Sequence, residues 1–241
     1  MHAPDYTLLD LHQHQAWRLQ DDPAFSHTAQ TQLVAVAFTE IVSLASCMPL
    51  VIVGEPDAGQ TLTAMLSLRE NDNAFSQSQW QGHVVPLSIQ TYPFNFALED
   101  NKLLTLIDEA CTRWQEEGKP LFSSDGTPTP FLKQRQSQLA QLANGLHLAD
   151  QFTAFLSQNK LLSPLQVTVT QEEGSENTIK GIYTINEAAL NALPADTLHQ
   201  LQQNGMLIAI HAMMVSLRQF NRLVQLARQQ GEAVTKITLS Q

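Results

Sequence analysis

Residues 50–68 read LVIVGEPDAGQTLTAMLSL, and this stretch decides how the rest of the chain is interpreted. Leu50–Val53 is a short apolar run, and 54–59 holds two glycines, a proline and an aspartate, which is the composition of a turn. From Thr61 to Leu68 the residues alternate with a period of two, as in a half-buried strand. The pattern therefore predicts a β-hairpin.

The same stretch also resembles a phosphate-binding loop, with Gln60 where a lysine would reach the phosphates. Residues 103–110, LLTLIDEA, likewise resemble the acidic strand end that holds magnesium in nucleotide hydrolases. However, Pro56 removes a backbone N–H, two carboxylates lie in the turn, and the period-two pattern leaves no helix after it. We therefore disfavour a nucleotide hydrolase and interpret 103–110 as a strand with an acidic end.

The composition is that of a folded protein with a sizeable core. The chain has 241 residues, of which 43% are hydrophobic and only 15% charged. Its net charge of −10 opposes a nucleic-acid binder, which needs a basic surface. No signal peptide pattern and no apolar run long enough to cross a bilayer is visible, so we expect a cytoplasmic protein.

We expect a single domain over 1–241. Its first thirty residues, polar and rich in His and Gln, are predicted to be a peripheral segment. The Gly/Pro/Ser-rich loop 117–130 is the best candidate for an internal boundary.

The hydrophobic spacing of the remaining segments predicts an α+β fold: a mostly antiparallel sheet built from hairpins, flanked by helices, with a helix-rich C-terminal half. The expected strands outside the first hairpin are 83–89, 94–98, 103–107, 165–170 and 179–185. The expected helices are 32–47, 131–158 with a break at Asn144-Gly145, two short helices opened at Asn186 and Pro194, and 206–228.

Candidate catalytic or metal-binding groups are few. His12 and His14 are the closest histidine pair, but two ligands are fewer than a metal site needs. Asp108 and Glu109 are neighbours on a predicted strand, so their side chains point to opposite faces. His211 lies near the apolar face of the last helix, without a partner that spacing can place beside it. We expect no metal, no cofactor and no catalytic residue.

Two segments have the mixture of residues that recognition surfaces favour. Residues 69–75, RENDNAF, followed by Trp80, form a polar loop with a cation, amides and aromatics. Residues 92–96, YPFNF, place three aromatics around a proline. Such residues would line a groove for a peptide or small molecule, or they would anchor their own segments to the core.

At these segments the chain resembles the SapC-like proteins of Gram-negative bacteria. The resemblance covers roughly 30–225, through the order and spacing of several weak motifs. These are Leu68-Arg69, Asn73, Phe75, Trp80, Val85-Pro86, Tyr92-Pro93-Phe94, Ile107-Asp108-Glu109, Gly118-x-Pro120-Leu121-Phe122, Gly126-x-Pro128, Gly181-Ile182-Tyr183, Glu187, Leu190, Gly205-x-Leu207 and Ser216-Leu217.

The resemblance implies a role linked to surface-layer protein loci, and similar proteins are found beside genes for outer-membrane receptors and for oxygenase- or halogenase-like enzymes. The resemblance identifies residues of this chain that match positions of the family pattern, but it assigns no catalytic residue. Those positions, which we take as candidate partner-binding residues, are Arg69, Asn73, Trp80, Tyr92, Phe94, Tyr183 and Glu187. Glu187 has the alternative role of an acid at a helix start. The family has basic residues before Tyr-Pro-Phe, whereas this chain has Gln90-Thr91, so an anion-binding role there is in doubt.

Two functional hypotheses follow. The first is a soluble accessory protein that binds a protein or peptide partner in surface-protein production or modification. It predicts an aromatic and polar groove near 69–96 without converging titratable groups. The second is an enzyme or enzyme component, with a deep pocket in which Arg69 and Glu187 meet His211 or Asp108. The apolar helix 206–228 fits a homodimer interface and a buried core helix equally well.

Overall fold

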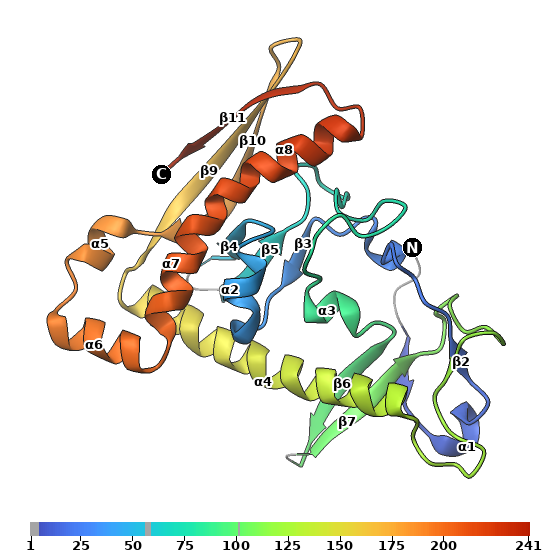
Figure 1. Cartoon of the computed structure of the whole chain (residues 1–241). Coiled ribbons are helices and arrows are strands. Elements are labelled where there is room, and N and C mark those ends of the chain that lie inside the picture. The colour runs from blue at the N-terminus through green and yellow to red at the C-terminus, as the bar shows by residue number, and fades with distance from the viewer. Residues whose placement is uncertain (1–4, 56–58, 101) are drawn as a thin grey trace.

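The computed structural model describes residues 5–55, 59–100 and 102–241. Its centre is a six-stranded antiparallel sheet in the order β11-β9-β10-β4-β5-β3 (Figure 1). The strands are β3 (Leu33–Ala35), β4 (Leu50–Val53), β5 (Thr61–Met65), β9 (Leu162–Gln171), β10 (Glu176–Ile185) and β11 (Val234–Ser240).

The predicted hairpin 50–68 is confirmed as β4 and β5, which pair from Leu50 with Ala64 to Val53 with Thr61. The turn residues 56–58 lie outside the described part of the chain. A strand begins at Thr61, where a phosphate loop would need the first turn of a helix, and this overturns the nucleotide-hydrolase alternative.

Two smaller sheets lie beside the main one. β1 (Tyr6–Leu8), β7 (Lys102–Asp108) and β6 (Phe94–Glu99) form one, in the order β1-β7-β6, and β2 (Arg18–Leu19) pairs with β8 (Lys119–Pro120) in the other. The first thirty residues thus supply one strand to each of the two smaller sheets, β1 to one and β2 to the other. Within this segment, the side chains of His14 and Leu19 are fully buried.

The helices cover the faces and ends of these sheets (Figure 1). In chain order they are α1 (Leu11–His14), η1 (Ser26–Thr28), η2 (Phe38–Glu40), α2 (Ile41–Leu44), α3 (Leu87–Gln90), α4 (Pro130–Gln158), α5 (Glu187–Asn191), α6 (Ala195–Gln203), α7 (Met206–Ser216), η3 (Leu217–Gln219) and α8 (Phe220–Gln229). The α+β class, the antiparallel hairpins and the long helices of the C-terminal half agree with the prediction from the sequence.

The long helix α4 has no break at Asn144-Gly145, so that prediction was wrong. A Cβ atom at Gly145 would lie 2.5 Å from the Cβ of Ala37, which precedes η2. Glycine is used here because α4 passes this close to the neighbouring segment, and not because the helix ends. A glycine required by close packing of two segments cannot be distinguished in a sequence from a glycine that ends a helix.

Two further segments differ from prediction. Residues 83–86 are irregular and 87–89 belong to α3, so 83–89 does not form the expected strand. Pro86 cannot donate to a strand ladder and is instead the N-cap of this short helix. The expected helix 32–47 is divided: its first part is β3, and only 38–44 is helical. Pairing of β3 with β5 provides hydrogen bonds that override the helical spacing.

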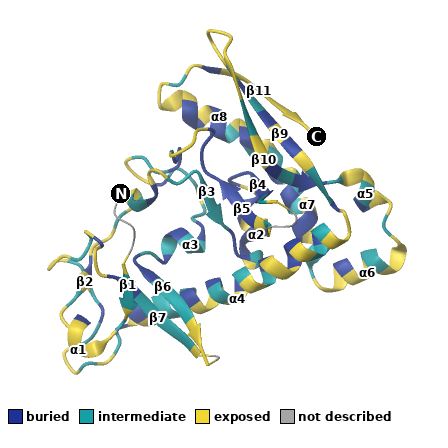
Figure 2. Ribbon diagram, turned by 180° about the vertical axis from the view of Figure 1, so that it is seen from behind, coloured by how far each residue is buried: buried dark blue, intermediate teal, exposed yellow. Residues whose placement is uncertain are grey.

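Buried side chains form two clusters, both crossed by α4 (Figure 2). The larger lies between the six-stranded sheet and its helices. The smaller lies under β6 and β7 and consists of Leu19, Phe94, Ile107, Leu121, Leu132 and Leu139. Among the residues described, no helix is long and apolar enough to cross a membrane.

Candidate functional site

A groove of about 510 Å³ opens where β10 extends beyond the end of β4. The two strands meet only at Ile182 with Val53 and at Tyr183 with Ile52. Residues 176–179 pair with β9 on one side, and within the described chain no strand pairs with them on the other. We call this hollow the β10 groove. Its apolar wall consists of Leu33, Val53, Met65, Leu68, Ile179 and Ile182.

A β-bulge separates the paired half of β10 from its open half. The pairing with β9 shifts register between Ile179 and Ile182, and Gly181 within the bulge has a φ of +76°. Only glycine adopts this conformation without strain, and no heavy atom lies within 4 Å of where its Cβ would be. The glycine is therefore required by backbone conformation, and the bulge bends the strand at the point where the groove begins.

Arg69 lies at the rim of the β10 groove and is held there by two carboxylates. Its guanidinium contacts Glu232 at 2.8 Å and Asp72 at 3.4 Å, while 54% of its side chain remains exposed. Burial raises the pKa of Glu232, although the charge of Arg69 opposes this shift. Lys180, on the opposite rim, is exposed and forms no ion pair with any described residue.

Asn73 and Trp80 hold their loop to the core. The Asn73 amide donates to the carbonyl of Thr28 at 3.2 Å and to its hydroxyl at 2.9 Å, and its oxygen accepts from the N–H of Phe75 at 3.0 Å. The Trp80 indole N–H donates to the carbonyl of Val84, and its ring stacks on Phe75. Both side chains are buried, so neither lines the β10 groove.

Tyr92 is joined to Pro93 by a cis peptide bond, and Phe94 follows as the first residue of β6. The Tyr92 hydroxyl donates to Asp108 at 2.8 Å, and its ring stacks on His27 at 4.2 Å. Burial, followed by its contacts with Cys111 and Asp108, raises the pKa of Tyr92. Phe94 belongs to the smaller core cluster.

Tyr183 and Glu187 follow the groove in sequence but do not line it. The Tyr183 hydroxyl donates to Glu55 at 3.4 Å. Glu187 is the exposed first residue of α5, whose N-cap is Asn186. An acid at this position is stabilised by the helix dipole, which was the alternative role considered for it.

The seven candidate residues therefore do not form one site. Only Arg69 lines the β10 groove, and Glu187, His211 and Asp108 lie on other elements. Within the described residues, no group of three potential metal ligands occurs.

The groove residues that sequence reasoning missed include those of the open half of β10 and its bulge, Asn177 to Gly181. Gly181, a glycine inside an alternating strand, was the available signal, since it indicates a bulge.

The comparisons with known proteins identify a family. No curated protein and no solved structure matches the chain. The family model for SapC matches residues 9–223, a span that contains the groove residues of β10 and the loop of Arg69. Since this match covers most of the 241 residues, the chain belongs to the SapC family.

Proposed function

We propose that this SapC-family protein is an accessory protein that binds an extended peptide segment of a partner protein in the β10 groove. The observation that carries the proposal is the open strand edge beside an apolar wall. An unpaired strand edge offers a row of backbone N–H and C=O groups, and peptides bind to such edges by adding a strand. The groove provides the edge in residues 176–181 and the apolar contacts beside it.

The lining of the groove, which combines polar and apolar side chains, supports a ligand segment in which apolar and polar residues alternate. Side chains of an added strand point alternately to the two faces of the sheet. One set would contact the half-buried Leu33, Val53 and Ile179 of the apolar wall. The backbone pairing would supply affinity, and these contacts would supply specificity.

Charge restricts the partner further. Lys180 offers an acidic side chain of the peptide a contact, whereas Glu70 on the lining disfavours a second acid nearby. The net charge of −10 disfavours a strongly acidic partner as a whole. We therefore expect an extended segment with alternating apolar residues and one acidic residue. The protein's link to surface-protein production or modification stays a prediction from the resemblance, and its cytoplasmic location stays a prediction from the sequence pattern.

We also propose that the exposed face of α7 forms a homodimer interface. Ile208 and Val215, two turns apart on this helix, are each 61% exposed. His211 lies between them in sequence, and a second hollow lined by Gln202, Leu207, Ile208 and His211 adjoins the face. An apolar helix face of this kind is a feature of protein interfaces. This proposal is independent of the β10 groove.

A display library of random linear peptides tests the proposed ligand. We expect selection on the wild-type protein to enrich extended peptides with alternating apolar residues. Lys180→Glu should weaken their binding about ten-fold, by the loss of a charge contact and the gain of a repulsion. Lys236→Glu, which changes an equally exposed lysine on β11, is the matched control and should leave binding unchanged. Equal affinity of the two variants would contradict the proposal.

A further inference from the structure

Three basic side chains from separate parts of the chain surround the backbone of residues 89–92, at the end of α3. Arg135 of α4 donates through Nη1 to the carbonyl of Gln90 at 2.8 Å. Arg113, from the loop after β7, donates through Nη1 to the carbonyl of Tyr92 at 3.4 Å. His27 of η1 stacks on the Tyr92 ring, with 4.2 Å between the ring centroids.

Neither Arg113 nor Arg135 has a carboxylate within 4 Å among the described residues, although Asp22 lies near Arg113 and Asp21 near Arg135. The ion pairs of the described residues are His14–Glu109, Arg69–Asp72, Arg69–Glu232 and Lys119–Asp21, and none includes Arg113 or Arg135. The two guanidinium groups bind carbonyls two residues apart, those of Gln90 and Tyr92. Both arginines are half-buried, so an external anion that bound them would meet charges that no carboxylate of the described chain pairs within 4 Å.

The charges also repel one another. Burial lowers the pKa of Arg135, and the nearby charge of Arg113 lowers it further. Burial and the charge of Arg113, in the same order, also lower the pKa of His27. Asp21 and Asp22 oppose these shifts only in part. An anion between the two guanidinium groups would remove this repulsion.

Unused hydrogen-bond donors remain for such an anion. Arg135 bonds only through Nη1, to Gln90 and to Gln138, so its Nε and Nη2 have no partner in the described chain. Arg113 uses Nε and Nη2 on the carbonyl of Gln20 and one N–H of Nη1 on Tyr92. A guanidinium has five N–H donors, so both arginines have donors to spare. The buried Nδ1 of His27 also has no partner, and it donates to an anion only when this nitrogen carries the proton.

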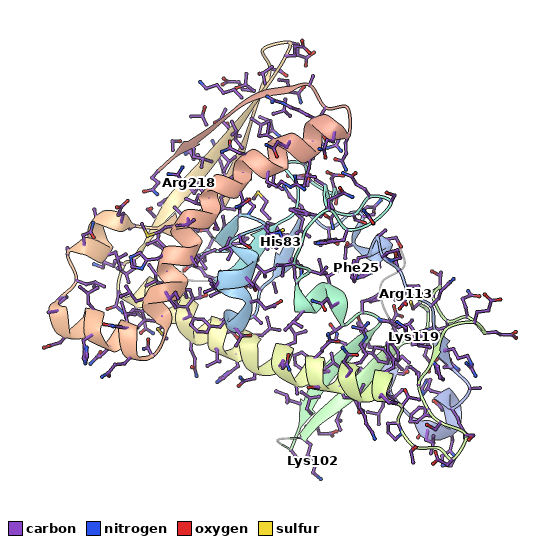
Figure 3. The ribbon with its side chains drawn as sticks, in the orientation of Figure 1. Phe25, His83, Lys102, Arg113, Lys119 and Arg218 are labelled. Atoms are coloured by element: carbon purple, nitrogen blue, oxygen red, sulfur yellow. The ribbon has the colours of Figure 1, made fainter. Side chains whose placement is uncertain are left out.

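Neighbouring groups hold the arginines in place. The Arg135 guanidinium lies over the ring of Phe131, with 5.3 Å between its Cζ and the ring centroid. Lys119 lies 5.8 Å from the same centroid, and its charge is paired with Asp21 at 2.7 Å. Figure 3 labels Arg113 and Lys119 on the side of the molecule that carries β2, away from Arg218 of η3. The ring therefore restricts the orientation of Arg135 without neutralising it.

We propose that Arg113 and Arg135, with His27 beside them, form a binding site for one oxyanion group, a carboxylate or a phosphate. Two guanidinium groups that approach one anion from separate elements form charge-assisted bonds with it, and each has the planar fork that fits such groups. None of these residues lines the β10 groove, so the site is independent of peptide binding there.

Titration with inorganic phosphate and, separately, with acetate tests this proposal at constant ionic strength. The readout is the NMR chemical shifts of the arginine Nε–H groups and of the amides of 89–92. We expect a saturable shift that Arg135→Gln and Arg113→Gln each weaken about ten-fold or more, the effect of losing bonds to a charged group. Saturation with phosphate alone would identify a phosphate site, and with acetate alone a carboxylate site.

The matched control is Arg218→Gln, which removes an exposed guanidinium elsewhere and should leave the shift unchanged. Arg135→Lys keeps the charge and is expected to fold, but it should bind more weakly because it lacks the planar fork. Shifts that never saturate with either anion, or that are the same in Arg135→Gln and Arg218→Gln, would overturn the proposal.

Discussion

Val53 of β4 lies opposite Ile182 of β10, and beyond this pair β10 continues beside β9 without β4. The divergence of the two strands creates the β10 groove. It occurs next to Gly181, whose positive φ places the bulge at this point. One backbone conformation therefore determines where the open strand edge begins.

Gly181→Ala should destabilise the protein and also weaken peptide binding. No atom would clash with the new Cβ, so the cost is that of a left-handed alanine, about 1 kcal/mol of the free energy of unfolding. Gly174→Ala is the matched control, because Gly174 in the β9–β10 turn also has positive φ and open space around it. Urea denaturation should give similar losses for both variants, with binding reduced only by Gly181→Ala. Unchanged binding in Gly181→Ala would show that the bulge does not shape the groove.

Asn73→Ala should be strongly destabilising. The substitution removes three hydrogen bonds and leaves the N–H of Phe75 and the carbonyl of Thr28 without this partner in the interior. We expect a loss of roughly 2–3 kcal/mol in the free energy of unfolding. Asn221→Ala, on the exposed face of α8, should be neutral or slightly stabilising, because alanine favours the helix. A small effect at Asn73 would leave it available for a binding role.

Gly145→Ala should destabilise the protein although alanine is the better helix former. Its Cβ would lie 2.5 Å from the Cβ of Ala37, and such overpacking costs roughly 1–3 kcal/mol. The double variant Ala37→Gly/Gly145→Ala removes the opposing atom and should recover much of the loss. Thermal unfolding of the wild type and of these two variants measures both effects. A double variant no more stable than Gly145→Ala would contradict close packing as the cause.

His27 should make the protein less stable at acidic pH. Burial, followed by the charge of Arg113, lowers its pKa from 6.5 to about 4, while Asp22 and the backbone of Ile89 oppose the shift. Between these two pH values the unfolded chain binds a proton that the folded protein does not. Stability should therefore be complete above pH 6.5 and fall by about 3 kcal/mol as the pH decreases to about 4.

An NMR titration of the His27 ring and urea unfolding at several pH values measure this effect. His27→Phe keeps an aromatic ring against Tyr92 and removes the titrating group. The difference in stability between wild type and His27→Phe should change over this window and be constant outside it. A His27 pKa near 6.5 would contradict the burial of its ring.

Ile208→Asp should dissociate the proposed homodimer. Light scattering coupled to gel filtration should report a dimer for the wild type and a monomer for this variant, because a carboxylate cannot be buried without a partner. Leu98→Asp is the matched control, since Leu98 is 68% exposed on β6, outside α7. A wild-type monomer at all concentrations would contradict the proposed interface.

The fold was largely predictable because its main elements have local signatures. Alternation from Thr61 and the glycine-rich turn predicted β4 and β5, and apolar spacing predicted α4. The predictions failed at positions whose conformation is determined by tertiary contacts. Gly145 looks like a helix break because its role, contact with Ala37, involves a segment about a hundred residues away. The C-terminal strand β11 was missed, since its exposed edge position gives it a weak apolar pattern.

The candidate site was less predictable. Arg69 was identified and lines the groove, but its opposite wall comes from β10, more than a hundred residues later in the chain. Asn73 and Trp80 attracted attention as polar and aromatic loop residues, and the structure places both in packing roles. Sequence spacing does not separate these roles, because a buried amide and an exposed one have the same local neighbours.

Hydrogen exchange of the β10 amides tests the central claim most directly. The measurement compares the protein alone with the protein saturated with a peptide selected from the display library. Addition of a strand should slow exchange in 177–181, where β10 has no second neighbour in the described chain, and leave the edges at β3 and β11 unchanged. Protection at β3, at β11 or on α7, with none in 177–181, would contradict binding in the β10 groove.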